Sequence, residues 1–303
     1  MDRRRLLLLL AALAFGAAAC EPGPDSKAGT AREGDAAAPP SATASAPRIV
    51  SLSPAITTTL LLLGEKRHLV GCSPWCRGTA DSTAVVWDGS QIDAERLLAL
   101  RPTHIVHQST LGNDPGEELA VLARGRDWST ASWRLDRLDD VRTMIVGLGE
   151  LLGGDAHERA RELAARLDAA TAPDENAAAL GPALILFSAD PPTAFGPGSY
   201  VDDLWASLGG TNAISGAAYP ELSVEQVARL DPGWIVVVGS DRLLDSIRDW
   251  PITASREGRI VHADDAGMLE PGGGLAGAIE SLRAELARAA GAARAARDSE
   301  KSP

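Results

Sequence analysis

Basic residues, aromatic rings and cysteines are scarce in this 303-residue chain. Lysine and arginine number 29 against 41 acidic residues, which gives a formal net charge of -12. Aromatic residues make up 4% of the chain, and there are three cysteines. A strongly acidic, lysine-poor surface repels phosphate backbones and offers no basic patch to anionic lipid headgroups. The composition therefore excludes nucleic acid as a partner.

The chain also lacks the short motifs of common enzyme classes. Neither Ser53 nor Ser188 stands in a G-x-S-x-G elbow, and no glycine-rich phosphate loop is present. The five histidines are scattered, and His104 and His107 point to opposite faces of an extended strand. Of these histidines, at most His107, at the rim after the strand, is expected to approach a ligand. We expect a protein that is not an enzyme, with no cofactor and no metal of its own; an extracytoplasmic enzyme is the alternative.

Long hydrophobic runs are missing as well. The apolar run from Leu6 to Ala19 follows three arginines and is shorter than the roughly 20 residues of a membrane-spanning helix. Residues 1–19 are therefore predicted to be a signal peptide rather than an uncleaved anchor. Cys20 follows as a lipidation site, although Ala17 also fits ordinary A-x-A cleavage. Residues 20–46 contain no residue that could seed a core and are predicted to be a disordered tether.

The remaining chain alternates short apolar strands with helical patterns. Arg48 to Leu52 predicts a strand, Ser53 the cap of a helix, and Gly64 its end. Alternation of this kind is typical of parallel sheets covered on both faces. The predicted parts are an N-terminal lobe over 47–152, a connecting helix over 155–173, a C-terminal lobe over 181–294 and a frayed tail over 295–303.

An internal repeat indicates two lobes of similar build. Residues 92–106 are echoed by residues 222–236 without a gap, at an offset of 130. Each copy has a polar helix cap, a glutamate in the first turn, a proline that ends the helix, and a buried strand. Chance similarity of two helix-strand units is the alternative. The predicted fold class is α/β, with two Rossmann-like lobes containing parallel sheets and joined by a long helix.

Several segments together resemble the periplasmic binding proteins of ABC importers for cobalamin, heme and ferric siderophores. They are RIVSLSPA from Arg48, LVGCS from Leu69, VWDG from Val86, GGTN from Gly209 and YPELSVE from Tyr219. The resemblance covers nearly everything from Pro47 to about Ala290 and looks closest to the cobalamin-binding member. It implies a ligand held between two lobes, delivery to an ABC permease with its ATPase, a monomeric protein, and a place in the periplasm or cell envelope.

The resemblance also implies roles for individual residues. Trp75, Trp87 and Tyr219 match aromatic residues of the cobalamin cleft, and Asp265 could hydrogen-bond a polar ligand edge. Large aromatic side chains suit a flat macrocycle because each offers an extensive apolar face. Trp205, Trp234 and Trp250, which lie within helix or strand patterns, are instead expected to pack in the core. Heme or a ferric siderophore is the alternative ligand, for which Arg77 could pair with a carboxylate.

Two acidic residues and two cysteines complete the expectations. Glu95 and Glu225 fall where the family carries an exposed glutamate on each lobe that pairs with permease arginines. The alternative is that both simply favour the positive end of a helix. Cys72 and Cys76 flank Trp75 and are predicted to form a disulfide, with a soft metal site as the alternative. The glycines 272–274 stand where relatives often have a larger polar residue, so ligand contacts from that loop are not expected.

Overall fold

The computed structural model describes residues 46–110, 114–263 and 266–300. All of these residues belong to one compact unit, Ser45–Pro303. The predicted signal peptide, the lipidation site Cys20 and the predicted tether up to residue 45 lie outside the described residues. Within the described ranges, no helix is both long and apolar enough to cross a membrane.

The first sheet has five strands, and every pairing in it is parallel. The strand order is β3-β2-β1-β4-β5. The strands are β1 (Ile49–Ser51), β2 (Leu69–Cys72), β3 (Ala84–Val85), β4 (His104–Gln108) and β5 (Ser129–Trp133), and the helices between them are α1 (Pro54–Leu62), η1 (Lys66–His68), α2 (Ala94–Ala99) and α3 (Gly116–Ala123). Ile49 and Val106 belong to one buried cluster and Val50 and Ile105 to another, as expected when successive side chains point to opposite faces.

The second sheet has the order β10-β9-β6-β7, with β8 paired to β6. Its strands are β6 (Pro182–Ala189), β7 (Pro192–Ala194), β8 (Thr211–Asn212), β9 (Trp234–Val238) and β10 (Ile260–Ala263), and its helices include α7 (Tyr200–Ser207), α8 (Val224–Leu230), α9 (Asp241–Arg248), α10 (Thr253–Arg256) and η2 (Ala266–Met268). The β6 and β7 pair is antiparallel, unlike the parallel pairing that the sequence predicts. The other pairings are parallel, and the α/β fold class is confirmed.

The internal repeat corresponds to equivalent elements of the two sheets. Helix α2 and strand β4 occupy the first copy, while α8 and β9 occupy the second. Asp93 and Ser223 cap the two helices by accepting bonds from the amides of Arg96 and Gln226. Both helices are followed by a residue with positive φ, Arg101 at 45° and Asp231 at 43°, again 130 positions apart. The repeat therefore extends to backbone conformation.

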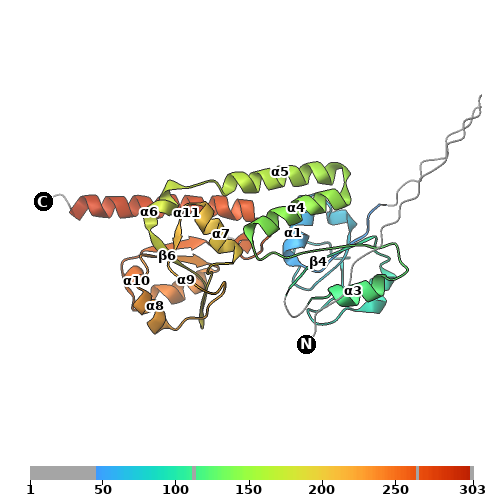
Figure 1. The fold of residues 1–303 in the computed structure, drawn as a ribbon, viewed down its shortest axis with the longest axis horizontal. Helices are drawn as coiled ribbons and strands as arrows, with labels where there is room; N and C mark the ends of the chain where they lie inside the picture. Colours follow the sequence, from blue (N-terminus) through green and yellow to red (C-terminus); the bar gives the residue numbers. More distant parts are fainter. Residues whose placement is uncertain (1–45, 111–113, 264–265, 301–303) are drawn as a thin grey trace, which may run out of the picture. The chain divides into compact units, whose positions relative to one another are not determined.

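A helical hairpin lies between the two sheets along the chain and ends in a short helix (Figure 1). It consists of α4 (Leu138–Leu152) and α5 (Gly154–Ala170), followed by α6 (Glu175–Leu180). Helix α5 coincides with the predicted connecting helix but ends at Ala170 instead of 173. A Cβ on Gly149 of α4 would lie 2.4 Å from the Cβ of Ala160 on α5. Glycine at this position is what allows the two helices to approach so closely.

The last helix, α11 (Leu275–Glu300), is longer than the sequence suggests. The helix continues to Glu300, past residue 295, where the predicted tail begins. Helix α11 packs against β10, α6 and α5, and Ile279 and Leu286 of the helix are fully buried. Bidentate hydrogen bonds from Arg166 on α5 to Glu280 add a polar link between the two helices.

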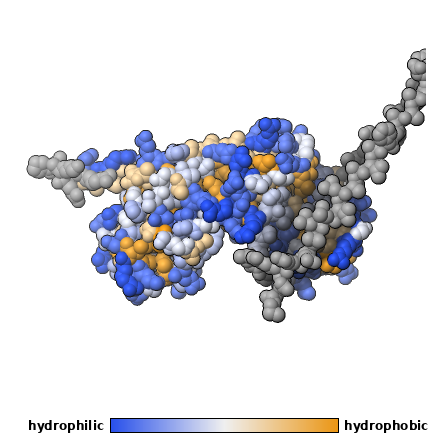
Figure 2. All heavy atoms as spheres, viewed as in Figure 1, coloured by the Kyte–Doolittle hydropathy of each residue, from blue (hydrophilic) through white to orange (hydrophobic). Residues whose placement is uncertain are grey.

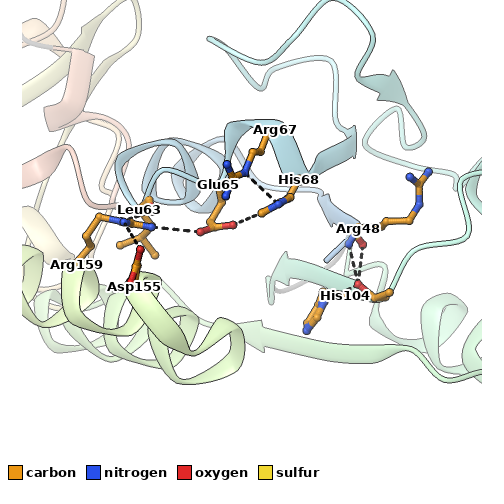
Figure 3. Close-up of polar contacts among 9 residues, drawn as sticks. Arg48, Leu63, Glu65, Arg67, His68, His104, Asp155 and Arg159 are labelled. Atoms are coloured by element: carbon orange, nitrogen blue, oxygen red, sulfur yellow. Dashed lines mark hydrogen bonds and ion pairs between the residues drawn. The ribbon is translucent and has the colours of Figure 1, made fainter. Parts of the chain in front are cut away.

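A polar network joins the end of α1 to α5 (Figure 3). Arg159 donates to the carbonyl of Leu63 at 2.6 Å and lies 3.5 Å from the carboxylate of Glu65. Glu65 is buried and its other oxygen meets His68 Nδ1 at 2.5 Å. Because a buried carboxylate is costly without partners, the two basic neighbours account for its position. The network fixes one end of the first sheet's α1 on the helical hairpin.

The tryptophans assigned to the core are confirmed there. Trp205 is 2% exposed, Trp234 8% and Trp250 9%.

Hydrophilic side chains cover much of the face drawn in Figure 2, and an apolar patch shows over the region of α8 and α10. Helix α8 carries one exposed large aliphatic side chain, Leu230.

Candidate functional site

The loop after β2 presents an exposed aromatic side chain. β2 ends at Cys72, and a turn follows in which the amide of Cys76 donates to the carbonyl of Ser73 at 3.2 Å. Trp75 lies in this turn and is 51% exposed. Single exposed apolar side chains are common on protein surfaces, so the significance of Trp75 depends on the residues around it.

The loop after β3 is fixed by an aspartate turn. Asp88 accepts hydrogen bonds from the amides of Ser90 and Gln91 and from the Ser90 hydroxyl, each at 2.9 Å. These donors lower the pKa of the Asp88 carboxyl, the amide of Ser90 contributing most. Trp87, just before it, forms an isolated bridge with Ile92. The indole of Trp87 is therefore carried by a rigid loop.

The two loops bring Trp75 and Trp87 into contact. Their ring centroids lie 6.1 Å apart with an interplanar angle of 77°, an edge-to-face arrangement. Gly89 makes the contact possible, since a Cβ there would lie 2.4 Å from the Cη2 atom of Trp75. Its φ of 99° also favours glycine.

A hollow of about 200 Å³ opens beside this pair, and we refer to it as the tryptophan hollow. Its lining comes from the two tryptophans and from residues at the carboxyl ends of β1 and β4: Leu52, Ser53, Pro54, Trp75, Trp87, His107, Gln108, Thr110 and Pro115. β1 lies between β2 and β4 in the sheet, so the chain reverses its direction of travel across the sheet at this point. Open α/β sheets bind ligands in the crevice at such a point.

A neighbouring hollow of about 420 Å³ shares Pro54, Trp75 and Gln108 with the first, and we refer to it as the Arg77 hollow. Part of its lining comes from the second half of the chain, through Leu269, Glu270 and Pro271. Glu270 accepts a hydrogen bond from Thr58 on α1 at 3.1 Å. Residues more than 190 positions apart thus line one surface, with Trp75 common to both hollows.

The glycines after Pro271 have a packing role. A Cβ on Gly272 would lie 2.4 Å from the carbonyl oxygen of Ala55, and the amide of Gly273 donates to Thr59 at 2.9 Å. Both glycines are buried. A larger side chain at Gly272 would separate this turn from α1, so the turn is tightly packed and not a flexible connection.

Tyr219 lines a different hollow, of about 470 Å³, with Arg134, Asp136, Arg137, Asp140, Gly198 and Ala218. It is 47% exposed, and its ring packs edge-on against Phe187 and Phe195 at 6.3 and 5.9 Å. Burial and the nearby charge of Asp136 raise the pKa of its phenol. The structure therefore brings Trp75 and Trp87 together in one hollow and gives Tyr219 other neighbours.

Asp265, the fourth expected ligand contact, lies outside the described residues. The polar residues of the tryptophan hollow did not emerge from the sequence as a group. His107 alone was expected to approach a ligand, whereas Ser53 and Gln108 were not. The signal that points to them is their position just after or at the ends of parallel strands. Within the described residues, no three His, Cys, Asp or Glu side chains gather as a metal site.

Cys72 and Cys76 are free thiols in the structure, so the predicted disulfide is not formed in it. The Cys76 sulfur accepts a bond from Thr57 Oγ1 at 3.0 Å and lies 3.2 Å from Ser73 Oγ. A hydrogen bond from Cys72, supported by these hydroxyls, lowers the pKa of Cys76 to about 6. The same bond, with burial, raises the pKa of Cys72. In the sequence, Trp75 thus lies between a cysteine with a raised pKa and a cysteine with a lowered pKa.

Glu95 and Glu225 lie at equivalent places of the repeat. Each is exposed in the first turn of its helix, α2 or α8. Hydrogen bonding by Ser223 lowers the pKa of the Glu225 carboxyl. The carbonyl of Val85, at the end of β3, accepts a hydrogen bond from Arg96 of α2.

One polar contact that the sequence did not indicate joins the start of α4 to α7. Arg137 makes a bidentate ion pair with Asp203, and the amide of Leu138 donates to the same carboxylate at 3.1 Å. The partners are 66 residues apart, and neither stands in a recognisable motif. Asp203 lies in the first turn of α7, where a carboxylate is favoured by the helix dipole.

Comparison with known proteins identifies the fold independently. The family model for periplasmic binding proteins matches residues 49–266. The periplasmic vitamin B12 binding protein BtuF of Vibrio cholerae has a similar structure, with a TM-score of 0.65 and 21% identity over 80% of this chain and 97% of that chain. The apo form of the periplasmic heme-binding protein RhuT from Roseiflexus sp. RS-1 gives 0.61 and 26%, over 81% and 99%.

A third similar structure is a periplasmic heme-binding protein from Pseudomonas aeruginosa, with a TM-score of 0.62 and 22% identity over 79% of this chain and 92% of that chain. A search of the curated proteins gives no match. Structures named for vitamin B12 and structures named for heme thus resemble this chain to a similar degree. Overall similarity does not distinguish between the two ligands.

Proposed function

This chain belongs to the periplasmic binding protein family, and we propose that it captures cobalamin or a related corrinoid for an ABC importer. The observation that carries the proposal is the edge-to-face contact of Trp75 and Trp87 beside the tryptophan hollow. A planar macrocycle offers a large apolar face, and two indoles set at 77° can contact both that face and its rim.

The neighbouring hollows supply room and polar partners for such a ligand. The tryptophan and Arg77 hollows share three lining residues, so a ring wider than either can lie across both. Gln108 belongs to both linings, and Glu270 belongs to the Arg77 hollow. Amide and carboxylate groups at these positions can hydrogen-bond the amide side groups around a corrin ring.

Heme is the second candidate, and Arg77 is the observation that favours it. Its side chain is exposed and lines the hollow next to Trp75. A guanidinium binds carboxylates well, and a heme carries two of them. A ferric siderophore has no feature of this site in its favour beyond those shared with the other ligands.

Titration of the purified protein with cyanocobalamin, hemin and a ferric siderophore, followed by tryptophan fluorescence, tests the proposal. We expect cyanocobalamin to quench the fluorescence at micromolar or lower concentration, and Trp87→Ala to weaken both quenching and affinity. Trp250→Phe, which changes a core tryptophan, is the matched control. Quenching by hemin alone would identify heme as the ligand in place of cobalamin. No response to any of the three ligands would contradict both the cobalamin and the heme proposals.

We further propose that the protein docks on the permease of an ABC importer, which works together with an ATPase. Glu95 and Glu225 would make the docking contacts. Two exposed carboxylates at equivalent places of the repeat could form one ion pair with each of two related permease subunits. We expect Glu95→Arg combined with Glu225→Arg to abolish uptake and leave ligand affinity unchanged. Loss of ligand affinity would instead make these carboxylates structural.

The proposed location is the periplasm or cell envelope, with the protein anchored through a lipid on Cys20. The family match supports export, and the sequence before residue 46 supports a lipid anchor with a tether. We expect Cys20→Ser to release the protein from membranes, as measured by fractionation. A protein that is soluble before the substitution would indicate ordinary signal cleavage.

A further inference from the structure

The Arg77 hollow has two charged residues in its lining, Arg77 and Glu270, and its other lining residues are uncharged. Glu270 is half-buried, and Thr58 donates a hydrogen bond to one of its carboxylate oxygens at 3.1 Å. Arg77 is exposed. Among the residues that the structure describes, none forms an ion pair with either side chain. A cation and an anion therefore line one hollow without neutralising each other, and both charges can act on a ligand.

Glu270 belongs to a turn that is held on both sides. Before it, the hydroxyl of Tyr200 on α7 donates to the carbonyl of Met268 at 2.7 Å. Burial, with smaller effects of Tyr219 and of the Glu270 charge, raises the pKa of Tyr200, so this hydroxyl remains a donor at neutral pH. After it, the amide of Gly272 donates to the carbonyl of Glu270 at 2.7 Å. The backbone that carries the carboxylate is therefore fixed when a ligand approaches.

The two charges respond differently to an amide and to a carboxylate on the rim of a ligand. A primary amide has a carbonyl oxygen that accepts from Arg77 and N–H groups that donate to the free oxygen of Glu270. A carboxylate offers acceptors alone, so it suits Arg77 and is repelled by Glu270. Gln108, which also lines the hollow, can donate or accept and does not distinguish the two groups.

We propose that Glu270 makes the site selective for macrocycles with neutral amide groups on their rim over macrocycles with carboxylates there. This inference rests on the proposed function, because it requires the edge of a captured ring to lie in the Arg77 hollow. Arg77 by itself favours carboxylates, and Glu270 opposes that preference by repelling them. The pair thereby favours a corrinoid with intact amide side groups over heme.

Cyanocobalamin and its monocarboxylates, in each of which one peripheral amide has been hydrolysed, provide the first test. They share the ring, the metal and the cyanide, and they differ by one charge. We expect isothermal titration of the purified protein near pH 7 to show at least one monocarboxylate bound about tenfold more weakly than cyanocobalamin, which corresponds to about 1.4 kcal/mol. Equal affinities for cyanocobalamin and every monocarboxylate would overturn the inference and leave the proposed function standing.

Variants provide the second test, with the ratio of cyanocobalamin affinity to monocarboxylate affinity as the readout. Glu270→Gln removes the charge and keeps the size of the side chain, so the ratio should fall toward one. Arg77→Gln removes the cation that attracts the carboxylate, so the ratio should rise.

Glu150→Gln is the matched control for the change in net charge. Glu150 is exposed on α4 and lines neither hollow, so its replacement should leave the ratio unaltered. An unaltered ratio in Glu270→Gln, or an equal change in Glu150→Gln, would overturn the inference.

Hemin carries two carboxylates and gives the same contrast for the heme candidate. Glu270→Gln should tighten hemin binding by about tenfold, and Arg77→Gln should weaken it. Hemin bound more tightly than cyanocobalamin by the unmodified protein would contradict the selectivity. If neither cyanocobalamin nor hemin binds, the proposed function itself fails, and this inference fails with it.

Discussion

Replacement of Gly89 by alanine tests whether the position of Trp75 matters for binding. The new Cβ would lie 2.4 Å from Trp75 Cη2, a distance that carbon atoms do not reach without a shift. The indole of Trp75 must therefore move, which disturbs its edge-to-face contact with Trp87. Gly89→Ala thus displaces the aromatic surface without removing it.

The size of the expected loss of ligand affinity follows from the exposed half of the Trp75 ring. A tryptophan buries about 150 to 250 Å² when fully covered, and Trp75 is 51% exposed, so a ligand can cover about 100 Å² of it. At about 25 cal/mol per Å² this is worth roughly 2.5 kcal/mol, or a ceiling of about 60-fold in affinity. Because a displaced indole keeps some contact, we expect a loss between about 5- and 50-fold.

Gly125→Ala is the matched control. Gly125 also has a positive φ, of 71°, and nothing lies within 4 Å of its Cβ position. Both substitutions cost about 1 to 2 kcal/mol of unfolding free energy through the backbone alone, which urea denaturation measures. Fluorescence titration should show weaker cyanocobalamin binding in Gly89→Ala only. Unchanged affinity and unchanged tryptophan emission in Gly89→Ala would refute the placement of Trp75 in the binding surface.

Two further predictions concern the thiols and the helical hairpin. With its pKa lowered to about 6, Cys76 becomes a thiolate as the pH rises above 6. Iodoacetamide should therefore label Cys76 much faster at pH 7 than at pH 5, while Cys72, whose pKa is raised, stays unlabelled. Labelling only after reduction would mean that the predicted disulfide forms in solution. Gly149→Ala should lower the unfolding free energy by about 1 to 3 kcal/mol, because its Cβ meets that of Ala160. Ala160→Gly should partly restore stability in that background, and an additive loss in urea denaturation would contradict the close contact.

Much of the local structure was predictable from residues close together in sequence. The caps Asp93 and Ser223 and the strands of the repeat lie where the sequence places them, because capping and side-chain alternation depend on a few neighbouring residues. The predicted last helix ended before the observed one does, because an alanine- and arginine-rich sequence gives no clear stop signal. The antiparallel β6 and β7 pair was missed because the predicted alternation of strands and helices implied parallel neighbours throughout.

The candidate site also combines features that could be predicted from the sequence with features that could not. The family resemblance singled out Trp75, Trp87 and Tyr219 as ligand contacts, and the internal repeat placed Glu95 and Glu225 at equivalent positions. Only the tertiary structure decided that the two indoles meet, that Tyr219 lines another hollow, and that His107 lies beside the tryptophans. The physical reason is that capping and periodicity act within a turn or a strand, whereas these contacts depend on the order of strands in a sheet and on the paths of the loops that leave it.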